Sequence, residues 1–202
     1  MRLSHNVLMI YRRFALISSL LSLLFTAPWA RAQTSEDAAW AALKKPGAIV
    51  LFRHALAPGG GDPPGFKVGD CSTQRNLSDE GQSQAKRIGQ TLRSRGVQVQ
   101  AVWHSQWCRT TDSAALAFPQ LREPVLKAEP AFNSFFSDRS TAPAQTAAAK
   151  KLLLNWRGPN TLVVFTHQVN ITQLTEVFPQ SGEGIVIERN GKQLRVVGRI
   201  QP

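Results

Sequence analysis

The chain has 202 residues, of which 43% are hydrophobic and 18% are charged. These proportions exclude a disordered tail and a collagen-like fibre, and the length suits one medium-sized domain with its own apolar core. The formal net charge of +11 favours an anionic partner, but the basic residues are dispersed along the chain, so we expect no nucleic acid among the partners.

The first 32 residues have the pattern of a secretory signal peptide. Basic residues come first, residues 14–27 are apolar but too few to span a membrane, and Ala30 and Ala32 form a cleavage site. We expect residues 1–32 to be removed, by general or twin-arginine export. Residues 33–202 then form one periplasmic or secreted domain with no stable membrane insertion. An uncleaved membrane anchor is the alternative.

Beyond residue 32, helical patterns alternate with short apolar runs. Unbroken runs such as 48–52 are typical of strands buried on both faces of a parallel sheet, and Asn190-Gly191 favours a tight hairpin. The fold class that follows is α/β: a three-layer sandwich with a mostly parallel central sheet, helices on both faces and an antiparallel C-terminal hairpin. In chain order we expect helix 36–45, strand 48–52, helix 78–96, strand 99–103, helix 109–118, helix 145–156, strand 161–165, helix 170–178 and strands 185–187 and 194–197.

Two segments do not follow this alternation. Residues 57–69 are rich in glycine and proline, which excludes regular structure, and the length of the segment indicates a functional loop over a site. Residues 121–142 show little periodicity.

The chain has two cysteines, Cys71 and Cys108, and both remain after removal of the signal peptide. In an oxidising compartment we expect them to form a disulfide, with two free buried thiols as the alternative. A bridge between them would tie the loop before Ser78 to the segment that begins at Cys108.

Charged and titratable residues follow three of the predicted strands. Arg53 and His54 come after the first, Arg109 comes shortly after the second, and His167 comes after the third. In open α/β sheets, ligands bind beyond the carboxyl ends of the strands, so these side chains should meet. Guanidinium groups match the oxygens of a phosphate, which makes a phosphate-binding site the prediction. His104 also follows the second strand, and we expect it to be structural.

Four blocks of residues carry a family resemblance that extends over about residues 48–178. They are Arg53-His54 after a buried strand, Leu77-Ser78 with Gly81, Gln84 and Ala85, Ser105 four residues before Arg109, and His167 after a later strand. Together they resemble the histidine phosphatase superfamily, the phosphoglycerate mutase-like and acid phosphatase clan. Within it, the chain looks most like a short exported bacterial branch that includes lipopolysaccharide core heptose phosphatases.

The resemblance implies a reaction through a phosphohistidine, without a metal or another cofactor. It makes His54 the nucleophile, oriented by a hydrogen bond at its other ring nitrogen. Arg53 and Arg109 would hold the phosphoryl oxygens, and His167 would add a donor or a positive charge. Arg75 is a candidate third phosphate contact. Gln168 and Asn170 belong to the stretch around the second histidine and are candidates for substrate binding.

Two positions depart from the family pattern. Position 55 is alanine where the first motif usually has glycine, and Gln168 stands where the acid phosphatase branch has a proton-donating aspartate. An amide cannot protonate a leaving alkoxide, so the general acid must come from elsewhere. We expect Asp138 in this role, with Glu129 and Glu80 as alternatives.

The sequence therefore predicts an exported phosphomonoesterase that acts on a phosphorylated small molecule or an envelope glycan. A catalytically weak module that binds a phosphorylated ligand is one alternative. A phosphohistidine protein phosphatase is another, because its nitrogen leaving group needs little acid assistance.

Overall fold

The computed structural model describes residues 27–202, so most of the predicted signal peptide lies outside the described residues. The chain divides into two compact units, Met1–Ser35 and Glu36–Pro202. Helix α2 (Ala27–Ala42) crosses this boundary and spans the predicted cleavage point after Ala32. No helix in the described part is both long enough and apolar enough to cross a membrane.

A six-stranded mixed sheet forms the centre of the second unit, in the order β3-β2-β4-β1-β5-β6. The first four of these strands are parallel to one another, and β5 and β6 form the antiparallel hairpin. The strands are β1 (Ile49–Arg53), β2 (Val99–His104), β3 (Leu126–Ala128), β4 (Thr161–Thr166), β5 (Gly184–Asn190) and β6 (Gln193–Ile200). The predicted fold class is confirmed.

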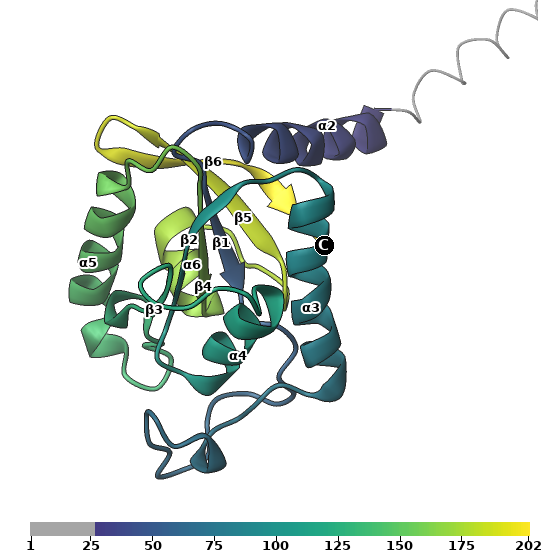
Figure 1. Ribbon diagram of the computed structural model, residues 1–202. Coiled ribbons are helices and arrows are strands. Elements are labelled where there is room, and N and C mark those ends of the chain that lie inside the picture. Colours follow the sequence, from purple (N-terminus) through teal and green to yellow (C-terminus); the bar gives the residue numbers. More distant parts are fainter. Residues whose placement is uncertain (1–26) are drawn as a thin grey trace, which may run out of the picture. The chain divides into compact units, whose positions relative to one another are not determined.

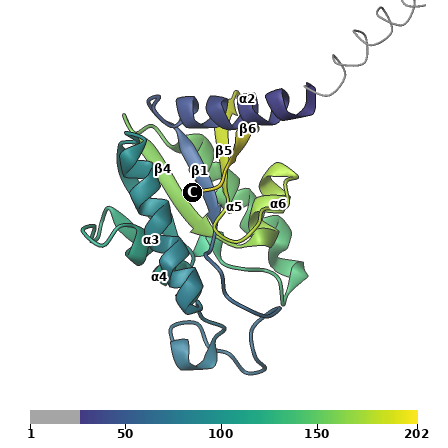
Figure 2. The same ribbon diagram turned by 90° about the vertical axis from the view of Figure 1, so that its right-hand side faces the viewer.

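Helices cover both faces of the sheet, as Figure 2 shows, with α3 and α4 on one face and α5 and α6 on the other. The helices are α3 (Asp79–Ser94), α4 (Cys108–Ala117), α5 (Ala142–Asn155) and α6 (Gln168–Thr175). The described part also contains the short 3-10 helices η2 (Cys71–Thr73), η3 (Pro130–Phe132) and η4 (Arg139–Thr141). A sheet covered on both faces needs strands that are apolar on both sides, which explains the unbroken runs of the sequence.

The strands divide the apolar residues between two cores. Along β1, Val50 and Phe52 point to the core shared with α3 and α4, whereas Ile49 and Leu51 point to the core shared with α5 and α6. All four side chains are fully buried. Burial of each such side chain contributes about 1.5–3 kcal/mol. The central strands are therefore rigid supports for whatever follows their carboxyl ends.

The register of the parallel strands aligns those ends. Arg53 of β1 lies opposite Thr166 of β4, and His104 of β2 lies opposite Phe165. Backbone bonds continue this alignment past the strands, because the His54 N–H donates to the Thr166 carbonyl oxygen and the Ser105 N–H donates to that of Phe165. The long loop that follows β1 lies at the same end of the sheet, beyond the carboxyl ends of the parallel strands (Figure 1).

Candidate active site

A pocket lies beyond the carboxyl ends of β1, β2 and β4. It contains Arg53, His54, Arg109 and His167, which the sequence placed after three separate strands, together with Arg75. The convergence follows from the parallel register of the strands. The full lining is Arg53, His54, Gly59, Gly60, Gly61, Asp62, Arg75, Arg109, Ser134, Phe136, His167, Gln168 and Val169.

His54 is held with one ring nitrogen occupied. Its Nδ1 lies 2.8 Å from the carbonyl oxygen of Ala55, and the residue is only 2% exposed. Burial, helped by the charges of Arg109, Arg53 and Arg75, lowers the pKa of His54 to about 3, despite the opposing bond to Ala55. The ring is therefore neutral at physiological pH. With Nδ1–H donating to the carbonyl, Nε2 keeps a lone pair, as a nucleophile requires.

Helix α3, which contains most of the second block of family-like residues, holds the segment after His54 in place. The Leu56 N–H donates to Gln84 Oε1 at 2.9 Å, and the Leu56 carbonyl accepts from the Ser78 N–H at 3.1 Å. A Cβ at Gly81 would lie 2.0 Å from the Leu56 oxygen, so only glycine lets α3 approach this closely. Ala55 itself is fully buried, with its N–H donating to Ser113 Oγ, so the methyl group is accommodated where the family usually has glycine.

His167 faces His54 from the end of β4. The two ring centroids are 5.6 Å apart in an edge-on arrangement. Nε2 of His167 lies 2.7 Å from Ser105 Oγ, which gives the serine of the third block a role. Burial, followed by the charges of Arg109 and the other nearby cations, lowers the pKa of His167 well below its ordinary value. Both imidazoles are therefore neutral in this structure.

Arg109 is 3% exposed and is paired with a carboxylate that the sequence analysis missed. Nη1 lies 2.7 Å from Asp62 Oδ1, and Nη2 lies 3.2 Å from Oδ2. Burial alone would raise the pKa of Asp62, but the hydrogen bond and charge of Arg109 lower it overall. One signal was available in the sequence, since Asp62 is the only acid in the loop 57–69 that was expected to cover a site.

The other two arginines of the pocket are anchored to backbone oxygens. Arg53 Nη1 donates to the Pro179 carbonyl at 3.1 Å, while its Nε is buried without a partner. Arg75 Nε donates to the Gly61 carbonyl at 2.9 Å, and its Nη1 donates to that of Ala57. Burial and the proximity of Arg109 lower the pKa of both guanidinium groups. The site therefore concentrates positive charge, and Arg75 also fixes the glycine-rich loop.

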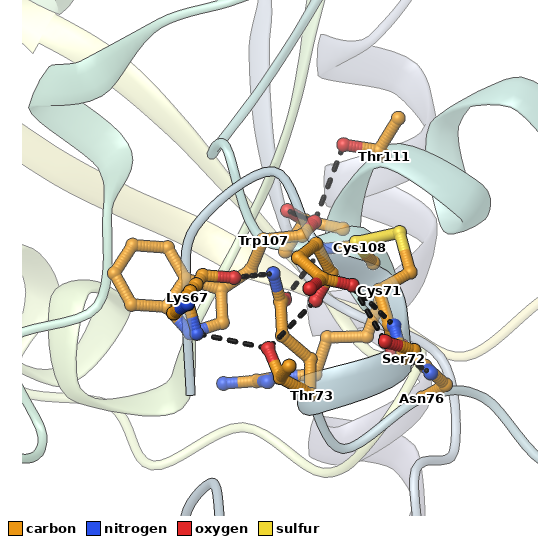
Figure 3. The surroundings of a disulfide bond; sticks show 12 residues. Lys67, Cys71, Ser72, Thr73, Asn76, Trp107, Cys108 and Thr111 are labelled. Carbon is orange, nitrogen blue, oxygen red and sulfur yellow. Dashed lines mark hydrogen bonds between the residues drawn. A yellow bond between two sulfur atoms is a disulfide. The ribbon is translucent and has the colours of Figure 1, made fainter. Parts of the chain in front are cut away.

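The predicted disulfide between Cys71 and Cys108 is present (Figure 3). Cys108 begins α4 directly before Arg109, and Cys71 begins η2 in the loop. Gln74 reinforces the junction, because its Oε1 accepts from the Cys108 N–H at 3.0 Å and its Nε2 donates to the Lys67 carbonyl at 2.8 Å. The loop is thus fastened to the helix that carries Arg109.

The structure does not bring the three predicted acids to the pocket. Asp138 is exposed and caps η4, where its Oδ1 accepts from the Ser140 N–H and Oγ. Glu129 pairs with Lys127 at 3.3 Å, and Glu80 lies exposed in the first turn of α3. Asp138 and Glu129 both lie between the second arginine and the second histidine of the sequence, but position along an aperiodic segment does not fix the direction of a side chain.

Of the two candidates for substrate binding that follow His167, only one lines the pocket. Gln168 lines the pocket, and its Nε2 donates to Thr172 Oγ1 at 2.9 Å. Asn170 is buried and does not line the pocket, because its Nδ2 donates to the Asn133 carbonyl at 2.8 Å. Asn170 therefore supports the segment that leads to Ser134 and Phe136 rather than a bound group.

The fold and this site define a class of protein, the phosphatases that work through a histidine. A model of the histidine phosphatase superfamily (branch 1) matches residues 49–160, more than half of the chain. The chain belongs to this superfamily, whose members are phosphatases. His167 lies beyond the matched segment, so its assignment to the site depends on the geometry.

Solved structures show the same fold at low sequence identity. The protein histidine phosphatase SixA complexed with tungstate is 14% identical with a TM-score of 0.55, over 77% of this chain and 97% of that one. The mycobacterial glucosyl-3-phosphoglycerate phosphatase Rv2419c in complex with VO3 is 13% identical with a TM-score of 0.51, over 74% and 96%. Rv3214 from Mycobacterium tuberculosis is 15% identical with a TM-score of 0.52, over 74% and 94%. A comparison with curated protein sequences gave no match.

Proposed function

We propose that the protein is an exported phosphatase that hydrolyses a phosphate monoester through a phosphohistidine on His54. One observation carries the proposal: the neutral ring of the buried His54 shares a pocket with three guanidinium groups and a second neutral imidazole. A neutral nucleophile beside clustered cations suits attack on an anionic phosphoryl group.

The reaction has two steps. His54 Nε2 attacks phosphorus, the bond to the leaving oxygen breaks with its electron pair, and that oxygen takes up a proton from solvent water. Water then attacks the phosphohistidine, the P–N bond breaks, and inorganic phosphate leaves. Arg53 and Arg109 stabilise the charge on the phosphoryl oxygens in both steps, and no metal is required in this scheme. In this scheme His167, which lies edge-on to His54, adds a hydrogen-bond donor beside the phosphoryl group.

The leaving group distinguishes two candidate substrate classes. Asp62 is the only carboxylate that lines the pocket among the described residues, and its pairing with Arg109 keeps it ionised. A site without a protonated acid favours leaving groups that need little assistance. This observation supports the second candidate, a phosphohistidine protein phosphatase, for which the name of SixA supplies a precedent.

We favour a phosphorylated sugar or other small molecule of the cell envelope as the physiological substrate. The pattern of residues 1–32 supports export, and the resemblance to lipopolysaccharide core heptose phosphatases suggests an envelope glycan. The structure of a sugar-phosphate phosphatase with the same fold is compatible with this choice.

The test is hydrolysis of para-nitrophenyl phosphate, a sugar phosphate and phosphohistidine by the wild type and by His54→Ala. We expect turnover by the wild type, and a loss on the order of 10³-fold or more in the variant, because the nucleophile is removed. Rapid quenching of the wild type should trap an acid-labile phosphoryl group on the protein. The preferred substrate of the three decides between the two candidate classes.

His104→Gln is the matched control. His104 ends β2 and has its Nδ1 2.8 Å from the carbonyl oxygen of the next residue, Ser105, but it does not line the pocket. This variant should keep most of the activity. Phosphate binding without turnover of any ester or phosphoramidate would instead indicate a module that binds phosphorylated ligands.

A further inference from the structure

We propose that Asp62 is a positioning residue for phosphoryl transfer, whose carboxylate holds Arg109 by one edge so that the other edge faces the phosphoryl group. This role rests on the proposed function. It assigns a task to the loop 57–69, which the resemblance to the superfamily left without one.

The geometry of the ion pair leaves part of Arg109 available. Asp62 accepts from the two terminal nitrogens, Nη1 and Nη2, and these nitrogens also make longer contacts, Nη1 with the Arg75 carbonyl oxygen at 3.4 Å and Nη2 with His167 Nδ1 at 3.5 Å. Nε of Arg109 is buried and has no partner. On the edge formed by Nε and Nη2, the Nε–H donor is therefore without a partner, and the second N–H of Nη2 has only the long contact with His167, which a phosphoryl oxygen could replace to make a bidentate contact. Arg53 likewise has an unpartnered, buried Nε. Both of these pocket-lining cations thus have one N–H donor without a protein partner.

Asp62 is itself held from the other side. Its Oδ2 accepts from Trp107 Nε1 at 3.0 Å, and its Oδ1 accepts from the Arg75 N–H at 3.2 Å. The carboxylate is only 5% exposed. The Trp107 ring also packs edge-on against His167, with centroids 5.5 Å apart. Asp62 is therefore fixed before any ligand binds, and a fixed carboxylate can fix the guanidinium it contacts.

The charge of the pocket supports the same role. Three guanidiniums and one carboxylate, with both imidazoles neutral, leave a net charge of two positive units. A phosphate monoester carries a charge of about −1.5 to −2 at neutral pH, so the pocket and the dianion are matched. Without Asp62 the pocket would hold one excess cation, which favours tight binding of phosphate but not its transfer.

Two other roles for Asp62 predict a different effect on kcat when the carboxylate is removed. A general acid must be protonated, whereas Arg109 lowers the pKa of Asp62. A carboxylate that merely competes with phosphate for Arg109 would inhibit, so its removal would raise activity. A positioning residue instead lowers kcat when it is removed, by the same factor for every leaving group.

The experiment compares the wild type with Asp62→Asn and Asp62→Glu on 2,4-dinitrophenyl phosphate and phenyl phosphate, whose leaving groups differ widely in basicity. For Asp62→Asn we expect kcat to fall about 10- to 100-fold equally for both esters, since a small misplacement of a binding group has an effect of this size. Calorimetric binding of inorganic phosphate should be unchanged or tighter, and its stoichiometry reports the folded fraction. Asp62→Glu, which keeps the charge, should recover part of kcat.

Asp79→Asn, which removes an exposed acid in the first turn of α3, is the control for the loss of one negative charge. A loss of kcat that grows with leaving-group basicity would identify a general acid and overturn the proposal. An unchanged or raised kcat in Asp62→Asn would also overturn it. Absence of turnover by a wild type that binds phosphate would overturn the proposed function, and this role with it.

Discussion

Three histidines of the described part lie at the carboxyl ends of strands, His54 and His167 just after β1 and β4 and His104 as the last residue of β2, yet only the first two line the pocket. His54 and His104 have the same local arrangement, each with Nδ1 2.8 Å from the carbonyl oxygen of the next residue. Their surroundings differ, because His54 lies among three arginines whereas Nδ1 of His104 also contacts Thr111 Oγ1 at 3.2 Å. The chemistry of an imidazole here depends on its neighbours rather than on its own hydrogen bond.

The pKa of His54, lowered to about 3, makes the stability of the protein depend on pH. Between the ordinary value near 6.5 and this value the unfolded chain binds a proton that the folded chain does not, so stability falls as the pH falls. His167 acts in the same direction. Denaturant unfolding of the ligand-free protein should show a contribution from His54 on the order of 3 kcal/mol between pH 6.5 and pH 4. The His54→Asn variant should have a shallower slope over this range, and parallel curves would contradict the assignment.

At the scale of single elements, α3 supports the site through close backbone contact. Gly81→Ala would place a methyl group 2.0 Å from the Leu56 carbonyl oxygen, two residues after His54. Alanine in place of glycine ordinarily stabilises a helix by about 1 kcal/mol, so a loss of stability in Gly81→Ala would show that the clash with Leu56 outweighs helix propensity. We expect a destabilisation of about 1–3 kcal/mol from overpacking and a lower kcat, measured by denaturation and by ester hydrolysis.

Gln82→Ala, on the exposed side of the same helix, should change stability by no more than about 0.5 kcal/mol. If Gly81→Ala were instead as stable as the wild type, the contact between α3 and the segment after His54 would not constrain the site.

The sequence predicted most of the regular elements because their apolar periodicity follows from burial on a two-faced sheet. It did not predict β3, since three residues at the sheet edge carry no periodic signal. It placed His54, Arg109 and His167 in one pocket because parallel strands align their ends. It could not place Asp62 or Asp138, because the path of an irregular loop depends on distant contacts such as the disulfide and the pair with Arg109.

At the scale of the whole molecule, export is the remaining prediction. Cells that produce the full chain should deliver a product that begins at Gln33 to the periplasm or the medium, as determined by fractionation and intact mass. Ala32→Leu removes the small residue of the predicted cleavage site and should leave a longer, uncleaved product. A full-length product in the soluble cytoplasmic fraction would contradict export.

The crowding of guanidinium groups in the pocket also bears on the lifetime of the protein. Arg53 and Arg75 have lowered pKa values because burial and the charge of Arg109 disfavour their charged forms, so the proposed phosphate site lowers the stability of the fold. A bound oxyanion offsets this repulsion, and binding to the folded state alone raises stability with ligand concentration. We therefore expect a phosphorylated substrate to stabilise the folded protein, which should resist unfolding and proteolysis best when the pocket is occupied.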